Sequence, residues 1–419
     1  MKIIKGNIVH AATPEKVSVL EGGCIVLHDD GTIDALLAKA PESYSAEVID
    51  YGDKLVMQSF ADMHLHAPQY PMLGMGMDLP LIDWLGTYTF PVEARFADVG
   101  FAREVYRKLA DELIRGGTTR VSIFSSLHTD ATLVLMEELE RAGVTGFVGK
   151  VNMDRNGGEK LCETTEESKR ETLRWLEACE DFKTLKPILT PRFTPSCTDA
   201  LMAWLGGLAE QRGLYVQSHL SENKSEIEWV RALHPDCEQY WQTYEKFGLW
   251  KSHTLMAHCV YSGRREREAM AKANVGVVHC ADSNMNLCSG TAPVREMLRE
   301  GLWVMLGSDI AGGAELEMNK VVTKSIRASK LRHIASGGSE NFLTVDEAYY
   351  LGTSSGHRYF GDRDGFAVGN KLHAIVVDDS AFPRAARDLT VHERFERAVY
   401  LMERAHICAV WSEGKKVVG

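Results

Sequence analysis

Long hydrophobic stretches and paired cysteines are both absent from this sequence. No apolar run reaches the roughly 18 residues that a membrane-spanning helix requires, so helical membrane proteins are excluded and no membrane partner is expected. The first residues, MKIIKGNIVHAA, lack a sustained apolar core and predict a strand rather than a signal peptide. The nine cysteines form no CxxC pair, which argues against a disulfide framework or a cysteine zinc finger. These absences favour a cytoplasmic protein with reduced thiols.

Basic residues are also fewer than acidic ones. The 47 basic residues are outnumbered by 58 acidic ones, and the formal net charge is −11. Non-specific binding to DNA or RNA needs a basic surface that displaces phosphate counterions, so nucleic acid is not an expected partner. The sequence contains no phosphate-binding P-loop, so nothing supports chemistry based on a nucleoside triphosphate. A small molecule is the expected partner.

The overall composition is that of an ordinary globular protein. Hydrophobic residues make up 45% and charged residues 25% of the 419 positions, which excludes intrinsic disorder and a collagen-like fibre. The length fits two or three domains, or one large barrel with an accessory domain. A chain of this length buries enough surface to fold without a metal ion or a disulfide.

The middle of the chain alternates between two patterns. Apolar, β-branched runs end in polar residues, and stretches of helical periodicity such as 164–181 and 198–212 lie between them. Eight such units over about 300 residues predict an α/β fold of the (β/α)₈ TIM-barrel type, although a doubly wound sheet gives the same alternation. The runs are residues 56–64, 118–124, 145–152, 187–193, 214–219, 254–258, 275–280 and 302–309.

Both ends of the chain have a different pattern, with short strands separated by turns. Residues 2–10 and 22–28 are strand-like near the N-terminus, as are 374–378 and 408–411 near the C-terminus. Two β-rich ends around a different middle predict one small β domain that is assembled from both termini.

Histidines and an aspartate occur where the predicted barrel strands end. His64 and His66 are two positions apart, so both rings point to the same face of a strand and can reach one ion. His219, His258 and Asp309 end later strands, at the face where barrel enzymes build their active sites. A lone HxH pair is more often coincidental, but the joint placement favours a metal site. Nitrogen and oxygen ligands without thiolates are typical of catalytic zinc.

Glu222 follows His219 by three residues, where a strand gives way to a helix. Taken alone, such a carboxylate is more often a first-turn helix residue that the helix dipole stabilises. Beside a metal ion, a carboxylate in a partly dry cleft can have its pKa raised towards neutrality and act as acid and base in turn. Glu222 is therefore a candidate proton shuttle.

The motifs around these residues resemble a known family. Residues 60–66 (FADMHLH) are similar to the first metal motif of the amidohydrolase superfamily, and residues 66–96 are similar to its guanine deaminase branch. The resemblance covers roughly residues 55–370. Residues 58–60 (QSF) depart from the usual Pro-Gly-Phe, and residues 279–284 (HCADSN) lack the usual proline and add Asp282 near the site. The other similar motifs are GKVNMD (149–154), TTEES (164–168), TPRF (190–193), QSHLSEN (217–223), MAH (256–258), SNMNLCSG (283–290) and GSDIAGG (307–313).

The resemblance implies a (β/α)₈ barrel over residues 58–365 and a composite β-sandwich from residues 1–57 and 366–419. It also implies one zinc ion per chain, with Fe²⁺ as an alternative, and a homodimer. Carried over to this sequence, the metal ligands are the four positions His64, His66, His219 and Asp309. His258 is a further ligand or a hydrogen-bonding partner of the bound water.

The implied reaction is the hydrolysis of guanine to xanthine and ammonia. Gln69, Arg192 and Phe193 fall where the family holds the purine. An always-charged arginine suits a carbonyl oxygen, the glutamine amide can donate and accept, and the phenyl ring supplies an apolar face. Without the resemblance, a salt-bridged arginine beside a core aromatic is an equally good interpretation. The other residues expected to contact the substrate are His66, His219, Glu222 and Asp309.

The expected mechanism is metal-assisted deamination. Asp309 accepts a proton from the attacking water, His258 directs the water at C2, and Glu222 protonates N3. Two alternatives stay open. One is a related deaminase that acts on an oxidised guanine, a pterin or a triazine. The other is a non-catalytic relative that keeps the site for binding, although the presence of every ligand and of Glu222 favours an enzyme.

Overall fold

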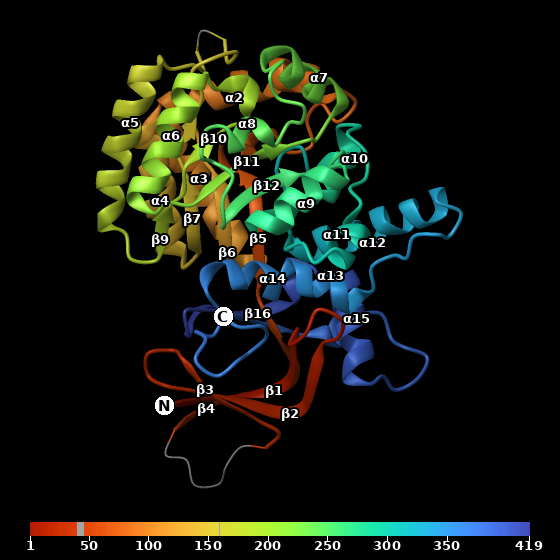
Figure 1. Cartoon of the computed structure of the whole chain (residues 1–419). Helices are drawn as coiled ribbons and strands as arrows, with labels where there is room; N and C mark the ends of the chain where they lie inside the picture. Colours follow the sequence, from red (N-terminus) through yellow and green to blue (C-terminus); the bar gives the residue numbers. More distant parts are fainter. Residues whose placement is uncertain (40–45, 159) are drawn as a thin grey trace.

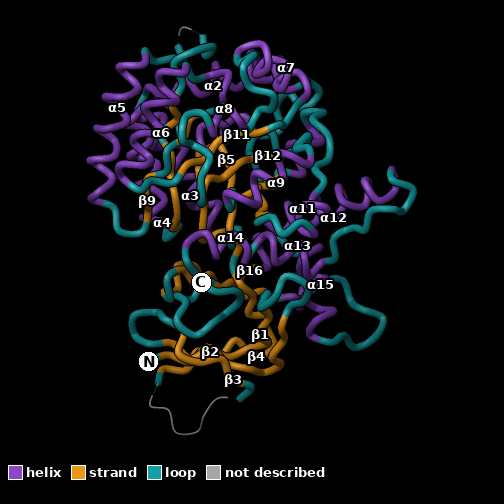
Figure 2. The backbone as a smooth tube through the Cα atoms, viewed as in Figure 1, coloured by secondary structure: helices purple, strands orange, loops and turns teal. Residues whose placement is uncertain are grey.

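The molecule consists of parallel strands surrounded by helices, above a β-sheet made from both ends of the chain (Figure 1). The structure is a computed structural model that describes residues 1–39, 46–158 and 160–419. In Figure 2 the strands of the upper part lie inside a layer of helices. The strand runs and helical stretches predicted for the middle of the sequence make up this upper part.

Two four-stranded sheets of parallel strands form the centre of the upper part. Their strand orders are β5-β6-β7-β9 and β11-β12-β13-β14, and a two-stranded sheet pairs β8 with β10. The bounds are β5 (Phe60–His66), β6 (Thr118–Phe124), β7 (Thr145–Gly149), β8 (Val151–Asn152), β9 (Leu185–Pro187), β10 (Thr190–Pro191), β11 (Val216–Leu220), β12 (Thr254–His258), β13 (Gly276–His279) and β14 (Val304–Leu306).

Backbone hydrogen bonds connect the two sheets at both edges. On one side, the N–H of Leu189 donates to the carbonyl of Tyr215, and the N–H of Gln217 donates to the carbonyl of Leu189, each at 2.9 Å. On the other side, the N–H of Asp309 donates to the carbonyl of His64 at 2.8 Å. This arrangement of parallel strands and outer helices is of the TIM-barrel type, so the fold class predicted from the alternation is confirmed at that level.

Helices begin where the sequence supplies caps. Thr164 accepts a hydrogen bond from the N–H of Glu167, whose carboxylate accepts from the N–H of Thr164 in return, and α5 (Thr165–Ala178) starts there. Thr198 caps α6 (Asp199–Arg212) by accepting a hydrogen bond from the N–H of Leu201, so both predicted helices are confirmed. The other α-helices are α1 (Leu81–Trp84), α2 (Phe90–Glu93), α3 (Val99–Arg115), α4 (Thr129–Ala142), α7 (Lys224–Leu233), α8 (Gln242–Glu245), α9 (Arg264–Ala273), α10 (Ala281–Asn286), α11 (Val294–Arg299), α12 (Met318–Ala335), α13 (Val345–Gly352), α14 (Ser354–His357) and α15 (Val391–Leu401).

The lower sheet has seven strands in the order β17-β16-β15-β4-β1-β2-β3. Strand β4 pairs with β1 on one side, in parallel, and with β15 on the other, antiparallel. The two β-rich ends therefore share one sheet, as their sequences predict, while its assignment as a β-sandwich stays a prediction. The bounds are β1 (Lys2–His10), β2 (Ser18–Leu27), β3 (Ile33–Leu37), β4 (Glu47–Gln58), β15 (Ala374–Val377), β16 (Ile407–Ser412) and β17 (Lys415–Val418).

Gln58 and Ser59 form the joint between the two parts. The predicted strand 56–64 is divided here, because its first residues belong to β4 and its last to β5. The Gln58 Oε1 accepts hydrogen bonds from the N–H of Ala11 at 2.9 Å and the hydroxyl of Ser354 at 3.1 Å. The Ser59 hydroxyl lies 2.6 Å from that of Thr119. The departure from Pro-Gly at this point thus provides polar links across the joint.

Two further findings concern the helices and the cysteines of the described residues. None of the helices within them is long and apolar enough to cross a membrane. All nine cysteines lie in the described part and all are free thiols.

Candidate active site

The five residues predicted to form a metal site lie together at one end of the parallel strands. His64 and His66 come from β5, His219 from β11 and His258 from the end of β12, while Asp309 follows β14. The Asp309 Oδ1 lies 3.2 Å from Nε2 of His64 and 3.5 Å from Nε2 of His66, and its Oδ2 lies 3.7 Å from Nε2 of His258. The Nε2 atoms of His66 and His219 are 3.1 Å apart.

The donor atoms of this cluster suit a metal ion. The Nε2 of His64 is buried and has no hydrogen-bond partner among the described residues, which is the state expected of a nitrogen that binds an ion. Candidate ligand atoms of His64, His66 and His219 lie within 4.8 Å of one another. The same spacing holds for His64, His258, Asp309 and the thiol of Cys280, a neighbour that the sequence analysis did not identify. Imidazole and carboxylate ligands of this kind fit zinc.

Hydrogen bonds on the far side of two rings fix which nitrogen faces the cluster. The Nδ1 of His219 lies 2.6 Å from the carbonyl oxygen of Arg192, and the Nδ1 of His258 lies 2.8 Å from Oδ1 of Asn284. Each Nδ1–H donates to that oxygen, so each Nε2 is directed to the cluster. Asn284 lies in α10, within the SNMNLCSG motif, and its role was missed because the ring it orients is 26 residues away.

Burial keeps most of these imidazoles neutral. It lowers the pKa of His64, and it lowers the pKa of His66 and His219 well below the ordinary value. Neutral imidazole is the form that binds a metal ion. Burial also opposes ionisation of Asp309, but His258 and His64 hold the pKa of its carboxyl well below the usual range. Burial likewise opposes protonation of His258, but the carboxylates of Glu222 and Asp309 outweigh this effect and raise the pKa of that ring. The cluster therefore presents three neutral imidazoles, from His64, His66 and His219, beside one carboxylate.

Asp62 supports the cluster from behind and was not singled out from the sequence, although it lies within the FADMHLH motif. Its Oδ1 accepts hydrogen bonds from the N–H of Ser308 at 2.9 Å and the N–H of His64 at 3.3 Å. Burial raises the pKa of its carboxyl to about 7. By joining His64 to Ser308, this side chain holds the first ligand strand against the segment that carries Asp309.

Glu222 lies between β11 and α7 and faces the cluster. Its Oε2 is 3.6 Å from Nε2 of His258, and its Oε1 accepts a hydrogen bond from the hydroxyl of Ser289 at 3.0 Å. Burial raises the pKa of the Glu222 carboxyl to about 7. Helix α7 begins at Lys224, and it is Glu226 that forms its capping box, so Glu222 precedes the helix and does not stabilise its first turn.

The backbone is in an uncommon conformation at several strand ends of the site. Ser221, His258 and Asp309 have φ values of 49°, 72° and 49°, in the left-handed region that residues other than glycine seldom adopt. Such positions cost of order 1–3 kcal/mol each and occur preferentially at functional sites. Ser221 turns the chain immediately before Glu222, and His258 and Asp309 are themselves members of the cluster.

A cavity opens beside the cluster, and the residues predicted to hold a purine line it. Gln69, Arg192 and Phe193 line it, and the Phe193 ring lies 6.5 Å from that of His219, edge to face. Arg192 forms an ion pair with the buried Glu93, which the sequence analysis did not identify. The other lining residues are His66, Leu81, Trp84, Leu85, His219, Glu222, Glu226, His258, Leu287, Asp309 and Gly312.

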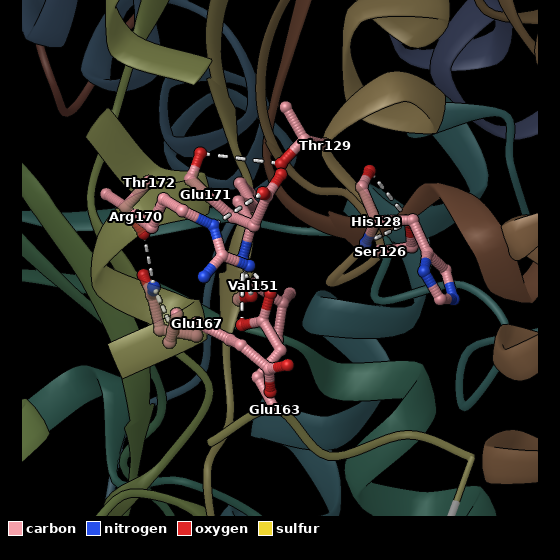
Figure 3. Close-up of polar contacts among 12 residues, drawn as sticks. Ser126, His128, Thr129, Val151, Glu163, Glu167, Arg170, Glu171 and Thr172 are labelled. Atoms are coloured by element: carbon pink, nitrogen blue, oxygen red, sulfur yellow. Dashed lines mark hydrogen bonds and ion pairs between the residues drawn. The ribbon is translucent and has the colours of Figure 1, made fainter. Parts of the chain in front are cut away.

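Two charged residues near the site have structural partners. Asp282, the extra carboxylate that the sequence places near the site, is bound by the ammonium of Lys324 at 2.7 Å and the N–H of Ala314 at 2.9 Å, so it holds the loop after Asp309 in place. Lys150 follows β7, and its ammonium lies 2.9 Å from the carboxylate of Glu163. Figure 3 shows Glu163 and its neighbours.

Comparisons with known proteins agree with this geometry. The amidohydrolase family matches residues 55–417. The guanine deaminase of Dictyostelium discoideum is 36% identical over 100% of this chain and 98% of its own length, and that of Rattus norvegicus is 35% identical over 99% and 96%. A crystal structure of guanine deaminase from C. acetobutylicum with bound guanine in the active site superimposes with a TM-score of 0.96 and 40% identity, covering 99% of both chains.

Proposed function

Because the chain belongs to the amidohydrolase family and is similar to guanine deaminases over its whole length, we propose that it hydrolyses guanine to xanthine and ammonia with one zinc ion per chain. The similarity identifies the chain as an enzyme of the guanine deaminase kind. The observation that carries the proposal is the convergence of four histidines and Asp309 beside a cavity whose wall contains Gln69 and Arg192.

The zinc ion would be held by His64, His66, His219 and Asp309. His258 would be a further ligand or a hydrogen-bonding partner of the water, and Fe²⁺ suits the same donors. The chemistry that zinc supplies when bound is Lewis acidity, which lowers the pKa of water from about 15.7 to about 7. The buried His64 nitrogen without a hydrogen-bond partner supports this assignment among the described residues.

Asp309, His258 and Glu222 would manage the water and its protons. The water oxygen bonds to C2 of guanine, with Asp309 accepting a proton and His258 fixing its direction of approach. One water proton ends on N3, delivered by Glu222, and the other leaves with the amine when the bond from C2 to the amino nitrogen breaks. A carboxyl with a pKa of about 7 can carry protons in both directions near neutral pH.

The rest of the cavity would hold the purine. Arg192 and Gln69 offer N–H donors to the carbonyl oxygen at C6, and Phe193 offers an apolar face. His66, His219, Glu222 and Asp309 line the same cavity on the side of the metal cluster, so they would contact the reacting end.

At the level of the whole chain, the proposal includes the architecture that the family implies. Residues 58–365 would form the (β/α)₈ barrel, and residues 1–57 and 366–419 a composite β-sandwich. Two chains would associate as a homodimer in the cytoplasm. The hydrogen bonds that join the parallel sheets at both edges support the barrel, and the shared sheet of the two ends supports the composite domain.

The direct test is ammonia release by the purified, zinc-loaded protein with a panel of amino-substituted heterocycles. The panel contains guanine, adenine, cytosine, an oxidised guanine, a pterin and a triazine. We expect guanine to have the highest kcat/KM, and adenine to react about 10⁴-fold more slowly, because it lacks the carbonyl that the donors bind. Faster turnover of adenine or cytosine would show that the substrate is wrong, and faster turnover of a pterin or triazine would assign a related deaminase.

A further inference from the structure

Glu93 is a buried carboxylate that the proposed chemistry does not use, and it lies behind the cavity wall, bonded to the lining residues Gln69 and Arg192. It ends helix α2, and only 1% of the residue is exposed. Its Oε2 accepts a hydrogen bond from Nη1 of Arg192, and its Oε1 accepts from Nη2 of Arg192 at 3.0 Å and from Nε2 of Gln69 at 2.8 Å. One carboxylate therefore binds both Gln69 and Arg192, the two side chains proposed to bind the purine carbonyl.

These bonds fix the direction of the Gln69 amide. Its Oε1 accepts from the N–H of Ala311 at 3.0 Å, while its Nε2 donates to Glu93. Rotating the amide by half a turn would place its oxygen against the Glu93 carboxylate and its NH₂ against the N–H of Ala311, so both contacts would become repulsive. The amide NH₂ carries two hydrogens, and one remains for a ligand. The cavity wall can therefore donate a hydrogen bond from the Gln69 amide to the purine.

The same carboxylate orients and neutralises Arg192. Two of the five N–H donors of the guanidinium are directed to Glu93, which leaves three for other partners. Phe90, from the same helix as Glu93, has its ring centroid 5.4 Å from the guanidinium carbon. Both charges are buried, with 4% and 2% of the side chains exposed. A paired arginine suits a neutral carbonyl oxygen, whereas an unpaired buried cation would favour an anion.

We propose that Glu93 is a positioning residue that makes this wall a hydrogen-bond donor only, and that it thereby selects purines with a carbonyl at C6. A purine with an amino group at C6 would place donors against donors, and a purine without a substituent there would leave the donors unpaired. This inference rests on the proposed function, because it takes the cavity to be the purine site. It adds the residue that gives Gln69 and Arg192 their selectivity.

The test compares two ligands in the variant Glu93→Gln. Hypoxanthine has the C6 carbonyl and no amino group at C2, so it is bound without being consumed, and unsubstituted purine lacks both groups. The substitution keeps the shape but removes the charge and replaces one acceptor oxygen with NH₂. Calorimetric titration should show hypoxanthine binding at least about 10-fold more weakly than to the wild type, with a change below about 3-fold for purine. A metal-loaded preparation is used throughout.

The matched control is Glu138→Gln. Glu138 is also a buried carboxylate bound by arginines, Arg103, Arg107 and Arg141, but it lies in α4 and does not line the cavity. The Glu138→Gln variant should leave the ratio of the affinities for hypoxanthine and purine unchanged. If Glu93→Gln does not fold, Glu93→Asp keeps the charge on a shorter side chain that cannot reach both partners, and it should lose part of the preference for hypoxanthine.

Two results would overturn the proposal. Unchanged binding of hypoxanthine would show that Glu93 does not set the donors, and an equal loss for both ligands would show a general role in shaping the cavity. Turnover of guanine by the wild type is measured on the same preparation. If that turnover is absent while the contrast between the ligands holds, the proposed function fails and the role of Glu93 stands.

Discussion

At the scale of single residues, the position of Glu222 separates proton transfer from helix capping. It lies before the cap of α7, whereas Glu226 occupies the first turn. Replacing Glu222 with Gln keeps the shape and one acceptor oxygen but removes the titratable proton. We expect full metal content, a near-normal thermal midpoint and a fall in kcat of at least about 10²-fold, which is the lower end of what general acid–base catalysis contributes.

The measurements that check this are metal content, thermal midpoint and turnover on one preparation. A helix-terminus carboxylate would instead lose about 0.3–1 kcal/mol of stability with little change in rate. Near-wild-type turnover would eliminate Glu222 as the proton shuttle, and loss of zinc would make it a ligand.

The sequence predicts the residues that converge on the cluster better than those that orient them. His64, His66, His219, His258 and Asp309 stand at recognisable strand ends, so their chemistry and placement can be seen together. Glu93 had no such signal, because it is one carboxylate in a helical segment and its partner Arg192 lies 99 positions further on. Asp62 and Asn284 were missed for the same reason, since pairing across the fold is not visible in local spacing.

At the scale of elements, the buried ion pair of Lys150 and Glu163 joins the residue after β7 to the residues just before α5. The Lys150 side chain is fully buried, and burial lowers the pKa of its ammonium while Glu163 partly offsets this. The ammonium also donates to the carbonyl of Val151 at 3.3 Å. Glu163 lines one pocket together with Glu171 of α5 and Thr129 of α4, and Figure 3 labels all three residues. The pair thus connects the end of β7 to the segment just before α5.

Replacing Lys150 with Met should therefore lower the free energy of unfolding by about 3–5 kcal/mol, because a buried carboxylate is left without its partner. Urea unfolding measures this loss. The double variant Lys150→Met with Glu163→Leu should recover most of it, since both charges are then gone. The control Lys169→Met removes an exposed ion pair with Glu166, 2.7 Å apart, and should cost less than about 1 kcal/mol. An equal loss of unfolding free energy in Lys150→Met and Lys169→Met would show that the buried ion pair contributes no more than the exposed one.

Periodicity predicted the elements of the fold better than their boundaries. Strands 2–10, 118–124 and 254–258 have the predicted bounds in the structure. The run 56–64 does not, because an apolar pattern reports burial and does not show which sheet supplies the hydrogen-bond partners. Both sides of the joint at Ser59 are buried, so the sequence contains no signal of the change from one sheet to the other.

At the scale of the whole molecule, folding should not depend on the metal ion. The apolar core of a chain this long is large enough to support the fold. We expect the variants His64→Ala and Asp309→Ala to lose zinc and activity while they keep a cooperative unfolding transition. Metal analysis, turnover and circular dichroism measure the three properties. The control His28→Ala changes a half-exposed histidine that pairs with Asp34, and it should keep metal and activity.

Removing the metal ion from the wild-type enzyme with a chelator tests, without a substitution, whether the fold survives loss of the ion. A bound ion stabilises the folded state only by its binding free energy, about 2.7 kcal/mol when present at 100 times its Kd. The thermal midpoint should fall and the protein should remain folded. Unfolding on chelation would make the site structural, and two tightly bound ions per chain would contradict a single-metal site.

The position of β4 in the lower sheet has a consequence for synthesis on the ribosome. This strand lies between β1, which is made before it, and β15, which is made more than 300 residues later. While the chain is growing, β4 can pair with β1 but its other edge has no partner, and open strand edges promote association between nascent chains. The sheet is completed only when the last part of the chain emerges, so β4, although it is translated early, is among the last strands to reach its final hydrogen bonding.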